Sequence, residues 1–282
     1  MIQSFIIMFR ETLEAALIVG IVLGYLRKSD RLRQAPAVYW GAAAGVAASV
    51  VAAYGFSRWS GGFTGRREEI FEGVLMLIGA LLLTTLILWM IGRAPGSQNA
   101  DIERRVERSL AGTSGLFLLV FVSILREGVE SVIFLAAAGA GSGQSLSGAL
   151  LGLTAALILG AALFLGLIRI RLSRFFAVTN VLLILFAAGL VAHGLHELQE
   201  AGLLPVLVEQ VYDINPPQTV PESYPLLHDK GHLGSIARGL FGYNGNPSLL
   251  EMAGYLAYLC GVVLLWLKSA RRTHSVHRTV QA

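Results

Sequence analysis

Two segments with the same order of charges lie inside apolar parts of the sequence. Residues 10–14 and 126–130 both follow the pattern Arg-Glu-x-x-Glu. Together they supply four carboxylates and two guanidinium groups, which leave a net negative charge when every group is ionised. Carboxylate oxygens are hard ligands, so such a site suits a hard metal cation. The alternative is a pair of structural salt bridges that hold helices together, although such a lock needs only one acid for each base.

Helix geometry accounts for the spacing within each segment. At about 100° per residue, Arg10, Glu11 and Glu14 occupy one sector of a helix and can face the interior of a bundle. Arg10 can pair with Glu14 one turn further on, and Arg126 with Glu130 in the same way. A charged residue costs roughly 2.5–3.5 kcal/mol at the centre of a membrane helix. We therefore expect a functional demand for these six charges.

Acidic residues also precede one of the long apolar stretches. Glu69 and Glu72 are three residues apart and share a helix face, and Glu68 adjoins them. These acids predict either the first site that a cation meets or a solvated interfacial cluster with Arg66 and Arg67.

Two histidines and two glutamates end another apolar stretch. His196 and Glu200 share one helix face, and His193 and Glu197 share another. They could bind metal or relay protons, or they could cap the helix and bond to the next loop. Their order differs from the His-Glu-x-x-His of helical zinc proteases, so an intramembrane metalloenzyme is disfavoured and we expect a transporter.

Composition places all of these charges in a membrane protein. The chain has 282 residues, of which 55% are hydrophobic and 14% charged, and its mean hydropathy is +0.65. An ordinary soluble domain has about 25% charged residues, so neither that class nor a disordered chain fits. Cys260 is the only cysteine, which excludes an internal disulfide and a multi-thiolate metal site. Because the basic residues border apolar stretches, they indicate membrane topology and not nucleic-acid binding.

Seven apolar stretches predict seven transmembrane helices in an all-α polytopic protein. They are residues 2–26, 37–56, 70–91, 114–138, 146–168, 175–195 and 249–267. Most Lys and Arg residues fall in alternate connections, at 27–33, 93–108, 169–174 and 268–278. By the positive-inside rule these connections are cytoplasmic, so the N-terminus is expected outside and the C-terminus in the cytoplasm.

The repeated charged segment divides the chain into two units of opposite orientation. The first and fourth stretches carry the segment and cross the membrane in opposite directions, which predicts two inverted three-helix repeats with a shared site near the midplane. The expected divisions are the first repeat (1–92), a cytoplasmic loop (93–113), the second repeat (114–201), an extracytoplasmic loop (202–248), a seventh helix (249–267) and a cytoplasmic tail (268–282). We expect one or two short helices in the extracytoplasmic loop.

With these segments in place, the chain resembles the high-affinity iron permease family. That family holds the fungal oxidase-coupled permeases and the bacterial permeases of elemental ferrous-iron uptake, and the bacterial branch is the more similar. The resemblance covers nearly the whole chain. It includes the two charged segments and, in the same order as in the family, residues 69–73, 187–190, 200–203, 241–243 and 247–248.

The resemblance implies iron permeation across the bacterial cytoplasmic (inner) membrane by a multi-pass protein, with no cofactor and no nucleic acid. It implies that the iron ligands are the four glutamates of the two segments, with arginines as their partners: Glu11, Glu14, Glu127 and Glu130, with Arg10 and Arg126. Glu69 and Glu72 match an acidic segment of the family. Bacterial members are ferrous permeases and fungal members take ferric iron, so the expected ion is Fe²⁺ or Fe³⁺. Extracytoplasmic partners that bind or oxidise iron are also implied.

Carboxylates alone do not select iron among hard cations. The alternative function is therefore a proton-coupled transporter of another divalent cation, such as manganese or calcium. Competition between these ions and iron would discriminate the two.

Overall fold

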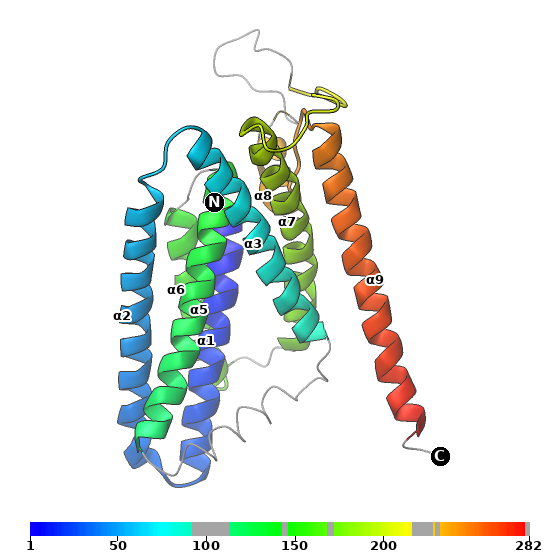
Figure 1. Cartoon of the computed structure of the whole chain (residues 1–282). Coiled ribbons are helices and arrows are strands. Elements are labelled where there is room, and N and C mark those ends of the chain that lie inside the picture. Colours follow the sequence, from blue (N-terminus) through cyan, green and yellow to red (C-terminus); the bar gives the residue numbers. More distant parts are fainter. Residues whose placement is uncertain (92–112, 143–145, 168–171, 216–227, 229–231, 280–282) are drawn as a thin grey trace.

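In the part of the chain that the computed structural model describes, every regular element is helical. The described residues are 1–91, 113–142, 146–167, 172–215, 228 and 232–279 (Figure 1). The elements are α1 (Ile2–Lys28), the 3₁₀ helix η1 (Leu32–Gln34), α2 (Ala35–Ser60), α3 (Arg66–Ile91), α5 (Thr113–Ser142), α6 (Leu146–Phe164), α7 (Leu172–Glu200), α8 (His232–Phe241) and α9 (Leu249–Thr279). The predicted all-helical class is confirmed. The predicted loop 93–113 lies outside the described residues except for its last residue.

Four segments among these residues are long and apolar enough to cross a membrane. They are Leu32–Ser60, Arg66–Leu88, Leu146–Phe164 and Ala177–Glu200. The apolar part of α9, Leu249–Leu265, is shorter. Helices α1 and α5 are 27 and 30 residues long, but each carries three charged residues near its centre. The chain therefore has the composition of a helical membrane protein, whereas a count of seven crossings stays a prediction.

Most helix ends lie a few residues from the expected boundaries, and three of these differences have a clear local cause. Helix α6 ends at Phe164, four residues early, because Gly166 takes a φ of 72° and Leu167 donates its N–H back to the carbonyl of Ala162. Helix α7 continues to Glu200, where Gly202 at φ 69° ends it in the same way. Helix α9 runs on to Thr279, well past residue 267, because no glycine or proline follows to stop it.

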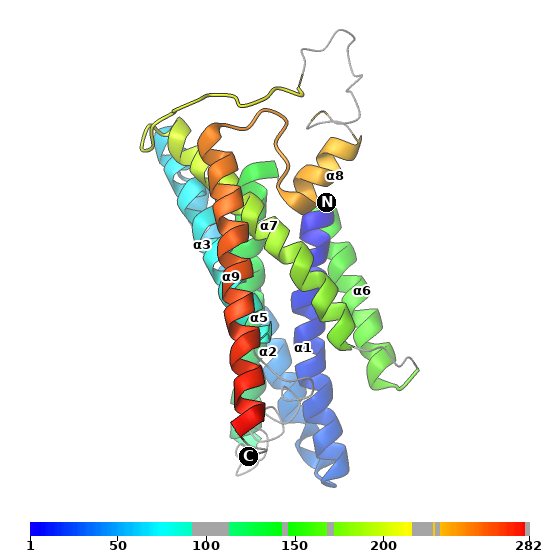
Figure 2. The same cartoon turned by 90° about the vertical axis from the view of Figure 1, so that its right-hand side faces the viewer.

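The long helices alternate in direction along the chain. Helix α1 starts at the upper end of Figure 1 and runs down, α2 returns, and the alternation continues until α9 ends at the lower end. Helix α8 and residues 201–215 lie at the same end as the N-terminus, where α8 contacts α1 (Figure 2). The basic turn that contains Arg27, Lys28, Arg31 and Arg33 lies at the opposite end. One end of the bundle is thus covered by α8 and the other by basic residues.

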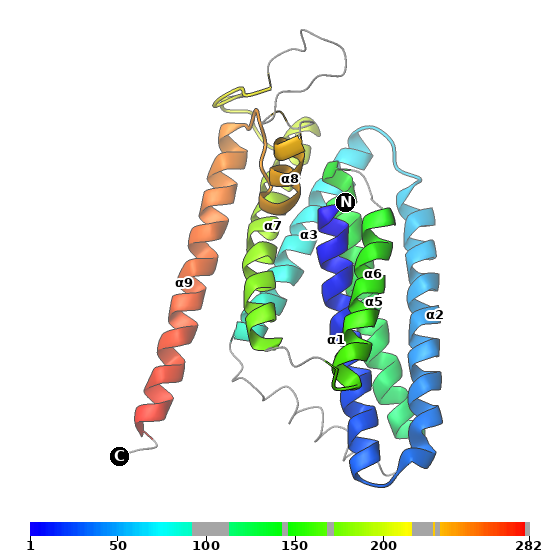
Figure 3. The same cartoon turned by 180° about the vertical axis from the view of Figure 1, so that it is seen from behind.

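The helices pack in pairs that have the symmetry of two equivalent three-helix units; we call this the exchange pattern. Helix α1 packs mainly against α6, α2 against α5, and α3 against α7, while α9 packs on α7 at the edge of the bundle (Figure 3). Suppose that α1, α2 and α3 correspond to α5, α6 and α7 in two equivalent units. Exchanging the units then turns the pair α1–α6 into α5–α2, which is the second pair, and leaves the pair α3–α7 unchanged. This is the pairing that two inverted three-helix units would give.

Small residues bring the helices of the first two pairs close together. On α6, Gly148 and Gly152 face α1, and a Cβ at Gly152 would lie 2.4 Å from the carbonyl oxygen of Phe5. On α2, Gly41 and Gly45 face α5, and a Cβ at Gly41 would lie 2.7 Å from a backbone oxygen of α5. Small residues four apart allow this close approach of helix backbones. The helices that carry the charged segments are therefore held in register by backbone contact.

Candidate metal centre

The charged segments of α1 and α5 meet in the interior of the bundle. Glu11, Glu14 and Glu127 each offer a carboxylate oxygen, these oxygens lie within 4.8 Å of one another, and all three residues are buried. Throughout the described ranges, no other group of three or more His, Cys, Asp or Glu residues is arranged in this way. We call these three residues the glutamate cluster. Oxygens this close can coordinate one hard cation after small side-chain movements.

On α1, Arg10 bridges both acids of its own segment. Its Nη1 lies 3.2 Å from Oε1 of Glu11, and its Nη2 lies 3.0 Å from Oε1 of Glu14. The pairing of Arg10 with Glu14, predicted from the spacing of four residues, is present. Because Arg10 and both acids are buried in the bundle, the guanidinium compensates carboxylates that water does not reach.

On α5, Arg126 repeats these contacts with its own acids. Its Nη2 lies 2.9 Å from Oε1 of Glu127, and its Nε lies 3.1 Å from Oε1 of Glu130. The carboxylate of Glu130 is not one of the three mutually close groups. The structure therefore brings three of the four predicted ligands together and leaves the fourth one turn away along α5.

The two segments differ in their access to the surroundings. The side chain of Arg10 is 0% exposed, whereas that of Arg126 is 51% exposed. Glu130 is also more exposed than its counterpart Glu14. A half-exposed arginine near the centre of a long helix needs water or polar groups beside it, since hydrocarbon does not solvate it. The charged segment of α1 is thus enclosed, whereas that of α5 is partly exposed at Arg126 and Glu130.

Two carboxylate oxygens of the cluster lack hydrogen-bond donors. Oε2 of Glu11 and Oε2 of Glu127 are buried, and within the described part of the chain neither has a hydrogen-bond partner. An unsatisfied buried acceptor is costly, and more so when it carries charge. A metal cation between α1 and α5 would supply the missing positive partner, so the donor set fits a hard cation.

Several acidic residues of α3 and α7 lie near one another but do not form a group of metal ligands. Glu68 is exposed and Glu69 is half-buried in the first turn of α3, and Glu72 is half-buried one turn further on. Glu197 of α7 lies within electrostatic range of Glu69 and Glu72, because α3 packs against α7. We call Glu69, Glu72, Glu197 and Glu200 the outer acids. Their oxygens do not converge as those of the glutamate cluster do.

The histidines of α7 have local hydrogen-bond partners. Nδ1 of His193 lies 3.0 Å from the carbonyl oxygen of Gly189, to which it donates. His196 bridges two acids, with Nε2 at 3.3 Å from Glu200 and Nδ1 at 3.0 Å from Glu251. His196 thus links α7 to α9, to which Glu251 belongs.

The sequence did not single out the contacts around the start of α9. Ser248 and Glu251 form a capping box: the backbone N–H of Ser248 donates to Glu251 at 2.9 Å, and that of Glu251 donates to the Ser248 hydroxyl at 3.2 Å. Asn244 also donates to Glu251, and Ser248 donates to Gln199 of α7. The spacing Ser-x-x-Glu before an apolar run was a usable signal. These contacts fix α9 to the outer end of α7.

Comparisons with known proteins agree over nearly the full length. The model of the iron permease FTR1 family matches residues 1–274. The chain is similar to a ferrous iron permease EfeU of Yersinia pestis, with 33% identity over 97% of this chain and 95% of that protein. For a protein of the same name from Escherichia coli O6:K15:H31 the identity is 31%, over 99% and 100%. An uncharacterized protein of Archaeoglobus fulgidus is 35% identical over 93% and 94%. No solved structure matches the chain.

Proposed function

The chain belongs to the iron permease FTR1 family, and from this premise we propose that it carries iron ions across a membrane through the two Arg-Glu-x-x-Glu segments. The glutamate cluster is the central binding site, and Glu130 is a further ligand that the ion meets on the partly exposed segment of α5. Relatives of nearly equal length are named ferrous iron permeases, which supports Fe²⁺ as the transported ion. The chain acts as a transporter, with iron as cargo and no resident cofactor.

One observation carries the proposal: three buried carboxylates from two different helices approach within 4.8 Å. Like charges at this distance repel one another, and burial strengthens the repulsion. Two guanidinium groups compensate only part of that charge. An arrangement that leaves negative charge and unsatisfied oxygens in the interior is unfavourable for a structural lock and favourable for a site that a cation visits.

The arginines take the place of the ion when the site is empty. Arg10 holds Glu11 and Glu14 in position, and Arg126 does the same for Glu127 and Glu130. Entry of the ion would replace these contacts with metal–oxygen bonds. Exchange between two sets of contacts of similar strength allows the ion to leave again, which conduction requires.

We propose seven membrane crossings, by α1, α2, α3, α5, α6, α7 and α9. The N-terminus would lie outside, and the C-terminus in the cytoplasm of a bacterial cell. Residues 1–92 and 114–201 would be inverted repeats, which the exchange pattern of helix pairs and the glycine contacts of α2 and α6 support. The loop 202–248 would then face extracytoplasmic proteins that bind or oxidise iron, and the outer acids would attract the ion on that side.

Uptake of radioactive iron into vesicles that contain the purified protein tests the proposal. Glu11→Ala and Glu130→Ala should each abolish uptake without reducing membrane insertion. Glu209→Ala is the matched control, because Glu209 is exposed in the loop and should be dispensable. Excess calcium or manganese should leave iron uptake unblocked at low iron concentration. Wild-type uptake by both substituted proteins would refute the role of the segments.

A further inference from the structure

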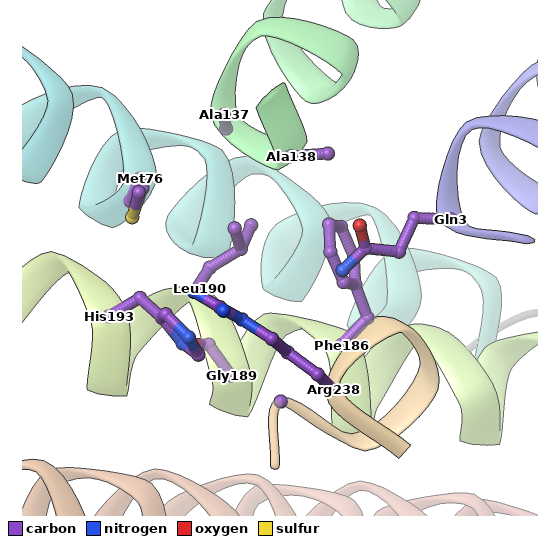
Figure 4. Close-up of a pocket in the computed structure, with 10 residues that line it drawn as sticks. Gln3, Met76, Ala137, Ala138, Phe186, Gly189, Leu190, His193 and Arg238 are labelled. Carbon is purple, nitrogen blue, oxygen red and sulfur yellow. The ribbon is translucent and has the colours of Figure 1, made fainter. Parts of the chain in front are cut away.

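A small pocket lies at the end of the bundle that α8 covers. It is bounded by the start of α1 and by α3, α5, α7 and α8 (Figure 4). Its polar lining consists of Gln3, His193 and Arg238, and its other walls are apolar or glycine. In Figure 4 the Arg238 side chain extends from α8 along Leu190 toward His193. The cavity is about 20 Å³, which is room for one water-sized species.

The pocket lies directly outward of the charged segments. Gln3 precedes Arg10 by seven residues on α1, and Ala137, another lining residue, follows Glu130 by seven on α5. Seven residues are two helical turns, so each pair shares a helix face with a separation of about 10 Å. On both α1 and α5, the residue that lines the pocket therefore lies on the helix face that carries the charged segment.

The same pocket lies inward of the outer acids. His193 precedes Glu197 by one turn on α7, and Met76, which also lines the pocket, follows Glu72 by one turn on α3. The order along these faces is thus the outer acids, then the pocket, then the glutamate cluster. Arg238 contributes a positive charge between two groups of carboxylates.

The fold fixes Arg238 in this position. Gly242 follows α8 with a φ of 66°, and its backbone touches α7 so closely that a Cβ on it would lie 2.1 Å from Cα of Gly189. The N–H of Gly242 donates to the carbonyl of Arg238 at 3.2 Å. The end of α8 is therefore held against α7, and the arginine one turn earlier is directed into the pocket.

We propose that Arg238 is a specificity-determining residue that selects against cations of higher charge on their way to the glutamate cluster. The inference rests on the proposed function. Carboxylates attract an ion in proportion to its charge, so the cluster alone favours Fe³⁺ over Fe²⁺. A fixed positive charge in a narrow approach repels the ion in the same proportion and raises the barrier more for the trivalent ion. Arg238 thus biases the route toward Fe²⁺.

This mechanism has a charge-dependent signature. Since Coulomb energy is linear in the charge of the ion, the logarithm of the rate gain on removing Arg238 should scale with that charge. If neutralisation speeds a divalent ion about tenfold, a trivalent ion should gain about thirtyfold. A steric or structural effect of the arginine has no such dependence.

Vesicles with the full-length protein test this signature with two probes. Ferrous iron is kept reduced by ascorbate, and lutetium(III), which stays a hydrated trivalent cation at mildly acidic pH, serves at the same free concentration as a redox-inert trivalent ion. Arg238→Gln should raise the uptake of both ions and raise the ratio of lutetium to ferrous uptake about threefold. Arg238→Lys keeps the charge and should retain the wild-type ratio. Arg58→Gln removes an exposed charge on α2 outside the pocket lining and should change neither rate.

The outcomes separate this inference from the proposed function. If the wild type takes up ferrous iron and Arg238→Gln leaves the ratio unchanged or slows ferrous uptake, Arg238 is not a charge filter, and the proposed function stands. If the inserted wild type takes up no iron, both fall. If Arg238→Gln does not insert, the lysine variant decides: a changed ratio in folded Arg238→Lys contradicts a mechanism based on charge.

Discussion

The two arginines of the charged segments have equivalent places in the sequence but should contribute unequally to stability. In Arg10→Met, the carboxylates of Glu11 and Glu14 lose a guanidinium that lies 3.2 and 3.0 Å away and is fully buried. In Arg126→Met, the lost guanidinium is 51% exposed. Methionine has a similar length and keeps the apolar part of the side chain, so the comparison isolates the charge.

The expected magnitudes follow from burial. Removing one partner of a buried ion pair costs about 3–5 kcal/mol, because a charge stays behind without compensation. A solvent-screened pair contributes about 0–1 kcal/mol. We therefore expect Arg10→Met to lower the free energy of unfolding by about 3–5 kcal/mol. Arg126→Met should lower it by less, because Arg126 is half exposed and only Glu127 of its two acids is fully buried.

Unfolding by SDS in mixed micelles, with a chelator present to keep the site free of metal, measures both values. The double variant Arg10→Met with Glu14→Gln should regain part of the loss, since it removes one of the stranded charges. Equal losses for the two single arginine variants would refute the reasoning, because they would show that the two segments are equally buried or equally solvated.

Three further predictions concern helix contacts and access. Gly152→Leu should lower the free energy of unfolding by about 1–3 kcal/mol, since its Cβ would lie 2.4 Å from a backbone oxygen of α1. Gly24→Leu is the control in the same SDS titration and should have no such effect, because no atom lies within 4 Å of the place of its Cβ. Ser248→Ala should cost about 1 kcal/mol through loss of the capping box and should speed amide hydrogen exchange in the first turn of α9, and unchanged exchange would contradict that role. A cysteine in place of Arg126 should react with a water-soluble maleimide much faster than one in place of Arg10, and similar rates would show that both positions have equal access to water.

Hydrophobicity and helix period were sufficient to predict the helices and the ion pairs within each segment. The pairs Arg10–Glu14 and Arg126–Glu130 follow from a spacing of four residues, which depends only on local helix geometry. The meeting of Glu11 and Glu127 was a weaker expectation, because it requires α1 and α5 to cross at one depth. The repeated segment in oppositely directed helices was the signal for it.

Other features depend on tertiary contacts that one sequence does not encode locally. The difference in exposure between Arg10 and Arg126 arises from neighbouring helices, since the two segments have the same pattern. The sequence did not single out Arg238, because its place in the pocket depends on the contact between Gly242 and Gly189. The length of α9 beyond residue 267 was missed because hydropathy reports where an apolar stretch ends and not where a helix ends.

The position of a bound ion tests the central claim most directly. Crystals of the protein soaked separately with ferrous and ferric salts can be measured at the iron absorption edge. We expect an anomalous peak within coordination distance of carboxylate oxygens of Glu11, Glu14 and Glu127, with the guanidinium of Arg10 displaced from at least one of its acids. Iron bound only at the outer acids, with the contacts of Arg10 intact in both soaks, would contradict the account.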